Sequence, residues 1–323
     1  MYGRVADAKI LVASSFNWKR FQVMKLPDGI DPHRFNALVA AAREEDFGAH
    51  GDLTSRLLPE SVLEAIGVWQ IVPRRQGRFC SRALVAPLLA ALAPEVHCEW
   101  LDPRPDAADV MPGEPLARLR GHTGQMLAAE RTLLNILQHL SGVATSTSRF
   151  VTAVAGTHAK IYDTRKTTPG MRDLEKYAVR IGGGHNHRIG LFDAVLIKDN
   201  HLAGIQVSRL AHAVFDMLGR IPSLPARPAF VEVECDGLDQ FAELLKIVGI
   251  DVILLDNFQP ESLRDAVKMR DAAGLRGKVE LEASGEARLE NVRTIAETGV
   301  ERIAVGAITH SAPILDIGLD ALA

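Results

Sequence analysis

The second half of the chain alternates short apolar runs with amphipathic helical patterns. Between the runs, apolar residues recur at helical spacing, as Leu238, Phe241 and Leu244 do. Strands and helices that alternate at this pace form βα units around a parallel sheet. The pattern predicts a closed or nearly closed α/β barrel, with an open doubly wound sheet as the alternative. The expected strands are the runs at 159–162, 194–197, 230–233, 252–255, 279–281 and 303–305.

The first half has a different pattern. Asp31 and Pro32 open a helix, because Asp is a favoured N-cap and Pro suits the first helical position. Runs punctuated by Pro and Gly then indicate a small α+β domain. A long helical pattern from Thr123 to about Ala155 joins the two halves, and Gly142 is expected to bend or divide it. The strand-like runs lie at 68–72, 77–80, 96–100 and 116–119.

Composition is that of an ordinary globular protein. The net charge of −3 argues against a nucleic-acid partner, because nucleic-acid binders usually carry a basic excess. No stretch approaches the roughly 18 apolar residues of a membrane span, and the start lacks a basic leader. We therefore expect no membrane association, signal peptide or anchor. Cys80, Cys98 and Cys235 lie far apart without a CxxC motif, which indicates a cytoplasmic protein without disulfides.

Polar residues follow each of the six strands predicted in the second half. The carboxyl ends of barrel strands share one face, and that face is catalytic. Polar residues also mark where strands stop, which would suffice for one strand, but six in succession favour a catalytic face. The residues after the strands are, in order, Asp163-Thr164-Arg165-Lys166, Lys198-Asp199-Asn200-His201, Glu234, Asp256-Asn257, Glu282-Ala283-Ser284-Gly285 and Gly306-Ala307.

Four cations gather around the first two of these strand ends. A helical pattern after the first strand ends at three successive glycines, which let the chain turn back towards its start. A structural ion pair would explain any one cation alone. For the group, a ligand with several negative charges is the better explanation, since guanidinium forks match carboxylate and phosphate oxygens. The four cations are Arg165, Lys166, Arg188 and Lys198.

The acidic strand ends suit a metal that prefers oxygen ligands. Glu234 and Asp256 offer carboxylate oxygens, which together with substrate phosphates favour Mg²⁺. His185 and His187 form an HxH motif, but no third His or Cys has zinc-like spacing, so zinc is a weak alternative. Backbone amides after the late strands are placed to cradle a phosphate. Those two small motifs are Ser284-Gly285 and Gly306-Ala307.

Several long motifs closely resemble the quinolinate phosphoribosyltransferase family, also called nicotinate-nucleotide pyrophosphorylase (carboxylating). The resemblance covers about residues 26 to 320. It is carried by Glu130-Arg131-Thr132-Leu133-Leu134-Asn135, Leu140-Ser141-Gly142, Asp163-Thr164-Arg165-Lys166-Thr167-Thr168-Pro169-Gly170, Gly182-Gly183-Gly184, Asn186-His187-Arg188, Ile197-Lys198-Asp199-Asn200-His201, Glu232-Val233-Glu234 and Leu254-Leu255-Asp256-Asn257.

The resemblance implies a reaction and an architecture. Quinolinate and phosphoribosyl pyrophosphate would give nicotinate mononucleotide, pyrophosphate and CO₂, with Mg²⁺ as cofactor, in de novo NAD biosynthesis. An N-terminal α+β open-sandwich domain would precede an incomplete α/β barrel. Two chains would form a homodimer whose active sites borrow residues from the partner, with a hexamer as the higher-order alternative.

The resemblance also implies roles for single residues. Lys166, Lys198, Glu234 and Asp256 are the implied catalytic residues, and the two acids also bind ribose hydroxyls and the metal. Arg131 is the arginine that the partner subunit would supply. Many members carry glycine where this chain has Glu286, a departure that concerns the phosphate geometry and not the reaction class. The implied substrate-binding residues are Arg131, Thr164, Arg165, Lys166, His187, Arg188, Lys198, Glu234, Asp256, Ser284, Gly285, Glu286, Val305, Gly306 and Ala307.

The predicted domain organisation has four parts. Residues 1–25 form an extension outside the resemblance, with a translation start at Met24 as a second explanation. Residues 26–140 form the sandwich domain and residues 141–310 the barrel. Residues 311–323 form a tail that packs back on the N-terminal domain.

Two other functions stay open. A relative with the same barrel could act on another base or in molybdate uptake, although the dicarboxylate-binding cluster argues against it. A non-catalytic barrel could bind a phosphorylated metabolite, which requires the strand-end carboxylates to be mere ion-pair partners. Turnover of quinolinate would exclude the second, and inactivity on nicotinate would argue against the first.

Overall fold

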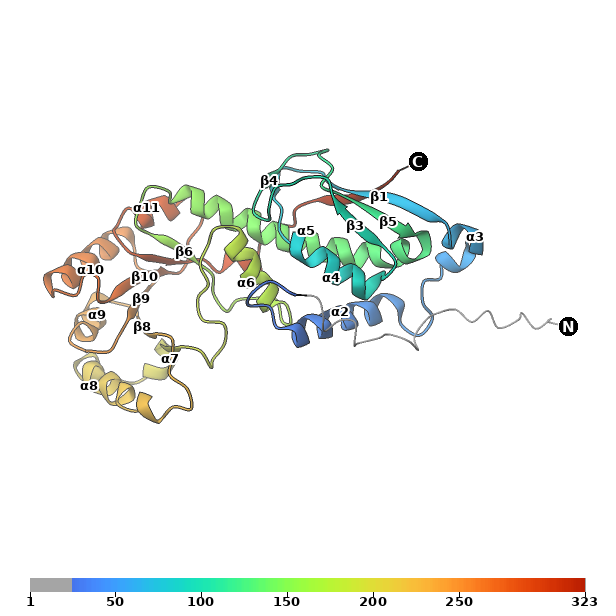
Figure 1. Cartoon of the computed structure of the whole chain (residues 1–323). Helices are drawn as coiled ribbons and strands as arrows, with labels where there is room; N and C mark the ends of the chain where they lie inside the picture. The colour runs from blue at the N-terminus through green and yellow to red at the C-terminus, as the bar shows by residue number, and fades with distance from the viewer. Residues whose placement is uncertain (1–24, 323) are drawn as a thin grey trace.

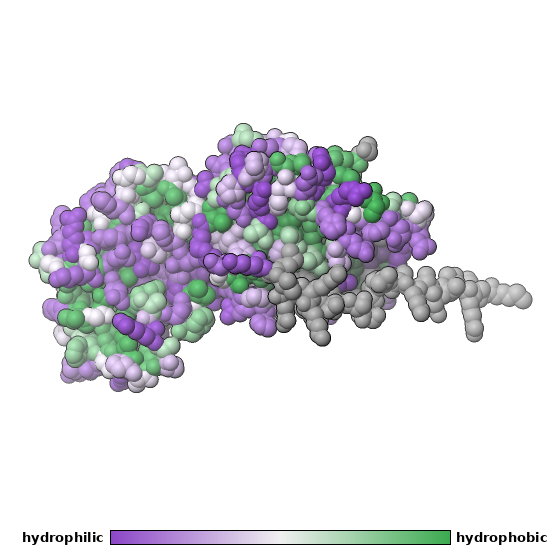
Figure 2. Space-filling view, in the orientation of Figure 1, coloured by the Kyte–Doolittle hydropathy of each residue, from purple (hydrophilic) through white to green (hydrophobic). Residues whose placement is uncertain are grey.

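The computed structural model describes residues 25–322, so the expectations for residues 1–24 and for Ala323 lie outside the described residues. Figure 1 shows two lobes connected by the long helix α5 (Thr123–Ala153). The surface in view mixes polar and apolar residues on both lobes (Figure 2). Within the described chain, no helix combines the length and apolar character that a membrane crossing needs.

The N-terminal lobe packs helices against an antiparallel sheet. In Figure 1, α4 (Arg82–Leu92) and α5 lie along one face of that sheet, and their fully buried Leu84, Leu88, Leu133 and Leu137 belong to the core. The side chain of Asp31 accepts a hydrogen bond from the backbone N–H of His33 at 2.8 Å, so it caps the first helix as predicted. The other elements are α2 (Pro32–Phe47), η1 (Ser55–Leu57), α3 (Glu60–Leu63), β1 (Ile66–Pro73), β2 (Gly77–Arg78), β3 (His97–Trp100), β4 (Asp109–Val110) and β5 (Ala117–His122).

The end of the chain returns to this lobe. The last strand, β12 (Ile317–Leu322), pairs antiparallel with β1 and completes a sheet of order β12-β1-β5-β3. The backbone N–H of Leu315 donates to the carbonyl of Gln138 on α5 at 3.0 Å. The Gln138 side chain donates to the carbonyl of Ile317 at 2.7 Å. The C-terminal segment, residues 313–322, is therefore bonded to both the sheet and the long helix.

Helix α5 runs without interruption through Gly142, so the predicted division of this helix is wrong. A Cβ at Gly142 would lie 2.2 Å from the carbonyl oxygen of Pro313 and 2.9 Å from Cα of Ile314. The missing side chain lets the C-terminal segment cross the helix at close range. Glycine here answers a packing requirement and not a helix end.

The second lobe confirms the predicted incomplete α/β barrel. Its strands are β6 (Lys160–Tyr162), β7 (Val195–Ile197), β8 (Val231–Cys235), β9 (Val252–Asp256), β10 (Glu280–Ser284) and β11 (Arg302–Ala304). The order β6-β11-β10-β9-β8-β7 pairs the first strand with the last and keeps the rest in chain order. A doubly wound sheet would instead reverse direction at a switch point. Because β6 and β7 lie at opposite edges of this sheet, the barrel is open between them.

Helices cover the outside of the barrel. In Figure 1, α8 to α11 lie around the sheet at the far end of the molecule from the N-terminal lobe. Buried Phe241, Leu244 and Leu263 on these helices pack in the core with the outward-facing strand residues. The elements of this lobe are α6 (Arg172–Ile181), α7 (Asp199–Leu202), α8 (Val207–Leu218), η2 (Ile221–Ser223), α9 (Leu238–Leu244), α10 (Pro260–Ala272), α11 (Val292–Ala296) and α12 (Ala307–His310).

A short segment, residues 185–188, partly fills the gap in the barrel. His185 forms an isolated parallel bridge with Tyr162 at the free edge of β6. The backbone N–H of His185 donates to the carbonyl of Ile161 at 2.8 Å, and the N–H of Asp163 donates to the carbonyl of His185 at 3.0 Å. We call residues 185–188 the return segment. It acts as a rudimentary strand beside β6.

Gly142→Ala should destabilise the protein, although alanine is the better helix former. The added Cβ would overlap the Pro313 backbone at 2.2 Å, so either α5 or the C-terminal segment must shift. We expect the free energy of unfolding to fall by about 1–3 kcal/mol, the usual cost of an overpacked interior. Urea denaturation measures it.

Gly124→Ala is the matched control in the same helix, because its Cβ would come no closer than 3.3 Å to Leu63. A gain of stability in Gly142→Ala would show that the C-terminal segment does not pack closely against α5.

Candidate active site

A buried carboxylate at the end of β6 holds the return segment in place. Asp163 is fully buried and accepts hydrogen bonds from Nζ of Lys176, from Nδ2 of Asn186 at 2.7 Å and from the backbone N–H of His187 at 2.8 Å. Lys176, which is 2% exposed on α6, also donates to the carbonyl of His187 at 3.0 Å. Burial raises the pKa of Asp163 and lowers that of Lys176, so these bonds offset a desolvation cost.

Three glycines turn the chain from α6 into the return segment. A Cβ at Gly182 would lie 2.7 Å from the carbonyl oxygen of Ala144 on α5, so the turn fits tightly against that helix. Gly183 has φ +87°, a left-handed conformation that glycine adopts without strain. The turn brings His187 and Arg188 to the end of β6, close to the start of the cationic loop that follows Asp163.

The sequence-predicted cations fall into two groups. Nζ of Lys198 lies 2.9 Å from Oε2 of Glu234 and is therefore paired. Arg165, Lys166 and Arg188 form no ion pair with any carboxylate of residues 25–322. Burial first, and then the charge of Arg165, lowers the pKa of Arg188, so the two guanidinium groups repel each other. Nε of Arg165 is buried without a hydrogen-bond partner in the described chain. An anionic ligand would neutralise this group.

Three carboxylates converge at the ends of β8 and β9. Glu234, Asp236 and Asp256 each offer an oxygen, and these oxygens all lie within 4.8 Å of one another. Such a set fits a cation that prefers oxygen ligands, such as Mg²⁺. Asp236 was not among the predicted residues, although its place just after a strand is the same signal that pointed to Glu234. A cavity of about 220 Å³ lies beside Glu234, lined also by Asp199, Leu202, Ile205 and Gln240.

The segment after β10 has an unusual backbone. Gly285 has φ +91°, and a Cβ there would lie 2.0 Å from Oδ1 of Asn257. Asn257, itself at φ +56°, donates through Nδ2 to Oδ2 of Asp256 at 2.7 Å. Glu286 has φ +45°, a conformation that glycine adopts more readily than other residues, and its side chain is exposed next to Arg288 at 3.5 Å. The Glu286 side chain therefore points outward and not into the site.

The last strand brings a second glycine to the cationic loop. A Cβ at Gly306 would lie 3.0 Å from Cδ of Lys166, so the lysine stem passes directly over this glycine. The hydroxyl of Thr309 donates to the carbonyl of Lys166 at 2.7 Å. Val305 is buried, whereas Ala307 is partly exposed. Lys166 and Gly306 therefore lie together, while Ser284 and Gly285 lie beside Asp256.

Arg131 stands apart from this group. It is exposed on α5, and no hydrogen bond or ion pair connects it to another residue of the described chain. Its neighbour Thr132 is buried and donates to Oδ2 of Asp46 at 2.7 Å. Arg131 is therefore available to a group outside its own chain.

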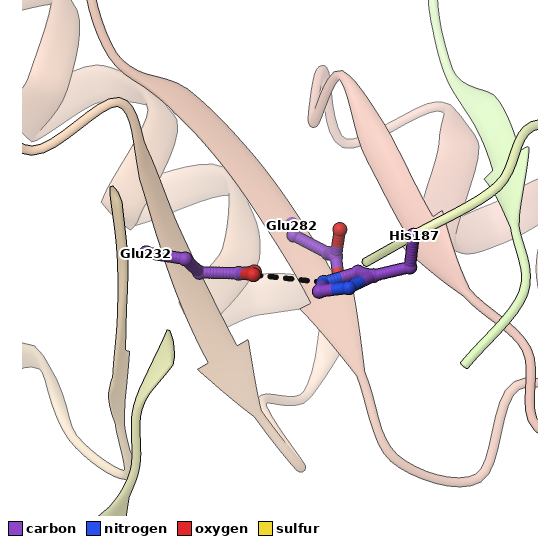
Figure 3. A group of neighbouring side chains, drawn as sticks. All are labelled: His187, Glu232 and Glu282. Carbon is purple, nitrogen blue, oxygen red and sulfur yellow. Dashed lines mark ion pairs between the residues drawn. The ribbon is translucent and has the colours of Figure 1, made fainter. Parts of the chain in front are cut away.

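His187 faces the barrel interior. Its Nε2 lies 2.7 Å from Oε2 of Glu232 and 3.5 Å from Oε1 of Glu282, as Figure 3 shows. Nε of Arg302 lies 2.8 Å from Oε2 of Glu282. These are ion-pair distances, but the carboxylate oxygens find no hydrogen bond of acceptable angle within residues 25–322. We call these four residues the interior cluster. Burial raises the pKa of Glu232 to about 7 and that of Glu282 to about 8.

The interior cluster fits an ion-pair network better than a metal site. His187, Glu232 and Glu282 could offer three ligand atoms to a metal ion. Arg302, however, already supplies a positive charge beside Glu282, so a divalent ion would leave excess positive charge in a fully buried place. His185 does not join the cluster but stacks on Tyr162 with ring centroids 5.3 Å apart. The two histidines of the HxH motif therefore point to different places.

Glu282→Gln should flatten the pH dependence of stability. Because burial raises the pKa of Glu282 from 4.5 to about 8, the folded protein retains a proton that the unfolded chain loses above about pH 4.5. The free energy of unfolding should therefore fall as the pH rises through this window. Glutamine cannot ionise, so the fall should be smaller in the variant.

Urea denaturation at several pH values between about 5 and 8 measures this slope. Glu290→Gln, at an exposed position, is the matched control and should follow the unmodified protein. Equal slopes for Glu282→Gln and the unmodified protein would contradict the prediction.

Comparison with known proteins identifies the family. Residues 52–141 match the N-terminal domain of quinolinate phosphoribosyl transferase, and residues 143–320 match its C-terminal domain. The chain is 48% identical over 215 residues to the nicotinate-nucleotide pyrophosphorylase [carboxylating] of Mycobacterium leprae, which spans 67% of this chain and 72% of that protein. It is 37% identical over 277 residues to a probable enzyme of the same name from Bacillus subtilis, covering 85% of this chain and 89% of that protein.

A solved structure agrees with these sequence matches. The nicotinate-nucleotide pyrophosphorylase from Francisella tularensis superposes with a TM-score of 0.78 at 35% identity, covering 93% of this chain and 99% of that chain. The match extends over both lobes and thus over the sandwich and the incomplete barrel. The chain belongs to the quinolinate phosphoribosyltransferase family.

Proposed function

We propose that this chain transfers the phosphoribosyl group of phosphoribosyl pyrophosphate to quinolinate, with decarboxylation. The products are nicotinate mononucleotide, pyrophosphate and CO₂, and the reaction belongs to de novo NAD biosynthesis. The observation that carries the proposal is the group of unpaired cations, Arg165, Lys166 and Arg188, beside the acidic group of the next strands. This combination suits a dicarboxylate and a phosphorylated sugar held side by side.

The cations serve first to bind quinolinate. A planar guanidinium can hold a carboxylate through two parallel hydrogen bonds, and the site has two guanidinium groups for two carboxylates. Arg165 and Arg188 repel each other without a ligand, so a dianion between them removes a cost that is present in the free protein. Thr164 and Lys166 complete this half of the site, and His187, whose ring faces the barrel interior, would support it from behind.

The carboxylates act on the ribose. Loss of pyrophosphate develops positive charge on the sugar, and Glu234 and Asp256 lie at strand ends where they would stabilise that charge. Asn257 fixes the carboxylate of Asp256 through its 2.7 Å hydrogen bond. Bound Mg²⁺, held by Glu234, Asp256 and Asp236, would supply neutralising charge for the pyrophosphate. Backbone groups at Ser284, Gly285, Glu286 and 305–307 would bind the phosphates.

Decarboxylation leaves an electron pair on the pyridine ring. Lys166 and Lys198 carry positive charge at the same face of the barrel and would stabilise it. In the free protein Lys198 pairs with Glu234, so the pair would part when Glu234 turns to the ribose. No covalent nucleophile is required, and Cys80, Cys98 and Cys235 have no role in this scheme.

The assembly and compartment are part of the proposal. Arg131, exposed and without a partner among residues 25–322, supports a homodimer in which it reaches the neighbouring active site. Leu191 and Phe192, which follow the return segment after two residues, are 72% and 69% exposed and would bury their surface in that contact. Dimers could associate further into a hexamer. Three free cysteines are compatible with the cytoplasm.

Turnover of carboxyl-labelled quinolinate with phosphoribosyl pyrophosphate tests the reaction directly. We expect labelled CO₂, pyrophosphate and nicotinate mononucleotide in equal amounts, and no product from nicotinate. Removing Mg²⁺ with a chelator should stop turnover, and adding it back should restore it. Product from nicotinate alone would favour transfer to another base, and tight binding without turnover would favour a non-catalytic barrel.

Glu234→Ala and Asp256→Ala should each lower kcat by at least about 100-fold, the usual scale for one electrostatic group in a transition state. Quinolinate binding, measured by calorimetry, should change much less, because the acids serve the ribose. Glu261→Ala, with its side chain 80% exposed on α10, is the control. Lost quinolinate affinity with unchanged turnover would contradict these roles.

Arg131 should act across the subunit interface. Subunits carrying Arg131→Ala and subunits carrying Lys198→Ala should each be inactive as homodimers. Mixed dimers should recover part of the activity, because one of the two sites then contains both intact residues. Activity measured on purified heterodimers decides the matter, and no recovery would place Arg131 in the site of its own chain.

A further inference from the structure

Both the backbone and the ring of His187 are bonded within the protein, although this residue precedes Arg188 of the cationic site. Its backbone N–H donates to Asp163 at 2.8 Å, and its carbonyl accepts from Lys176 at 3.0 Å. The backbone N–H of Arg188 donates to Nδ1 of the ring at 2.7 Å. That bond makes Nδ1 the acceptor, so Nε2 carries the proton.

The protonated Nε2 faces two carboxylates inside the barrel. Oε2 of Glu232 lies 2.7 Å away and Oε1 of Glu282 lies 3.5 Å away. Phe230 closes a further side, with its ring edge-on to the imidazole at a centroid distance of 5.4 Å. Both glutamates have no exposed surface, so neither can touch a substrate from this position.

Arg302 contacts the second of these carboxylates, Glu282. Its Nε lies 2.8 Å from Oε2 of Glu282, and its guanidinium lies 4.0 Å over the ring of Tyr162 and 5.3 Å from the ring of Phe230. Two acids and one fixed cation therefore surround one imidazole in a closed interior. Replacing such a set by apolar residues is often neutral or stabilising, so a contribution to stability does not by itself explain why these charged residues are buried here.

We infer that Glu232, supported by Glu282 and Arg302, is a positioning residue for quinolinate binding. It holds the ring of His187, and the hydrogen bond from the next backbone amide to that ring sets where Arg188 lies. The inference rests on the proposed function, in which Arg188 binds a carboxylate of quinolinate. Glu232 thus acts through His187 and does not contact the substrate.

The test compares Glu232→Leu with Glu232→Gln. Both changes remove the charge and nearly preserve the volume, but only glutamine keeps a polar oxygen at the 2.7 Å contact with Nε2. We expect Glu232→Leu to weaken quinolinate binding at least tenfold by calorimetry, and Glu232→Gln to stay within about threefold. The KM for phosphoribosyl pyrophosphate should stay unchanged in both. Leu281→Ala, a cavity variant on the opposite face of β10, should lower stability without a selective loss of quinolinate affinity.

Rescue by glutamine together with selectivity for quinolinate supports the inference. Unchanged quinolinate affinity in Glu232→Leu would overturn it, and so would equal losses for both substrates in both variants. If Glu232→Leu does not fold, Glu282→Leu and Glu282→Gln carry the same comparison on the second carboxylate. An unmodified protein that does not bind quinolinate would instead overturn the proposed function, and the inference with it.

Discussion

The buried ion pair between Asp163 and Lys176 is the contact on which the candidate site depends. The barrel has no strand between β6 and β7, so the return segment has a paired neighbour on one side only. Asp163 and Lys176 together bind both the N–H and the carbonyl of His187, which completes the hydrogen bonds that a second neighbouring strand would have made. Because removing one partner of a buried pair leaves an uncompensated charge, replacing either residue alone lowers the free energy of unfolding.

The charged residues of the barrel lie in two layers, the interior cluster and the strand ends. In the interior cluster, Arg302 pairs with Glu282, and Glu232 lies against His187. At the strand ends, Arg165 and Arg188 have no carboxylate partner within residues 25–322. The return segment passes through both layers, with His187 turned inward and Arg188 one residue further on.

Much of this could be predicted from the sequence, since parallel strands place their carboxyl ends on one face and local polar residues then reveal the site. The roles of the buried residues Lys176 and Arg302 could not be predicted from the sequence. Lys176 lies between Glu175 and Tyr177 on a helix, where a lysine usually faces solvent, and only its distant partner Asp163 shows that it is buried. The alternation of Glu232 and Glu234 with valines does place both on one strand face, but Arg302 comes from a strand whose pairing is long-range. The strand β12 was missed as a strand, because pairing with β1 and not its own pattern defines it.

We infer that the buried ion pair of Asp163 and Lys176 positions the cations of the quinolinate-binding half of the site. Calorimetric titration of quinolinate into Lys176→Met, after circular dichroism shows the variant to be folded, tests it most directly. We predict an affinity at least tenfold below that of the unmodified protein, about 1.4 kcal/mol or more, although the Lys176 side chain is buried. Unchanged affinity in the folded variant would contradict it.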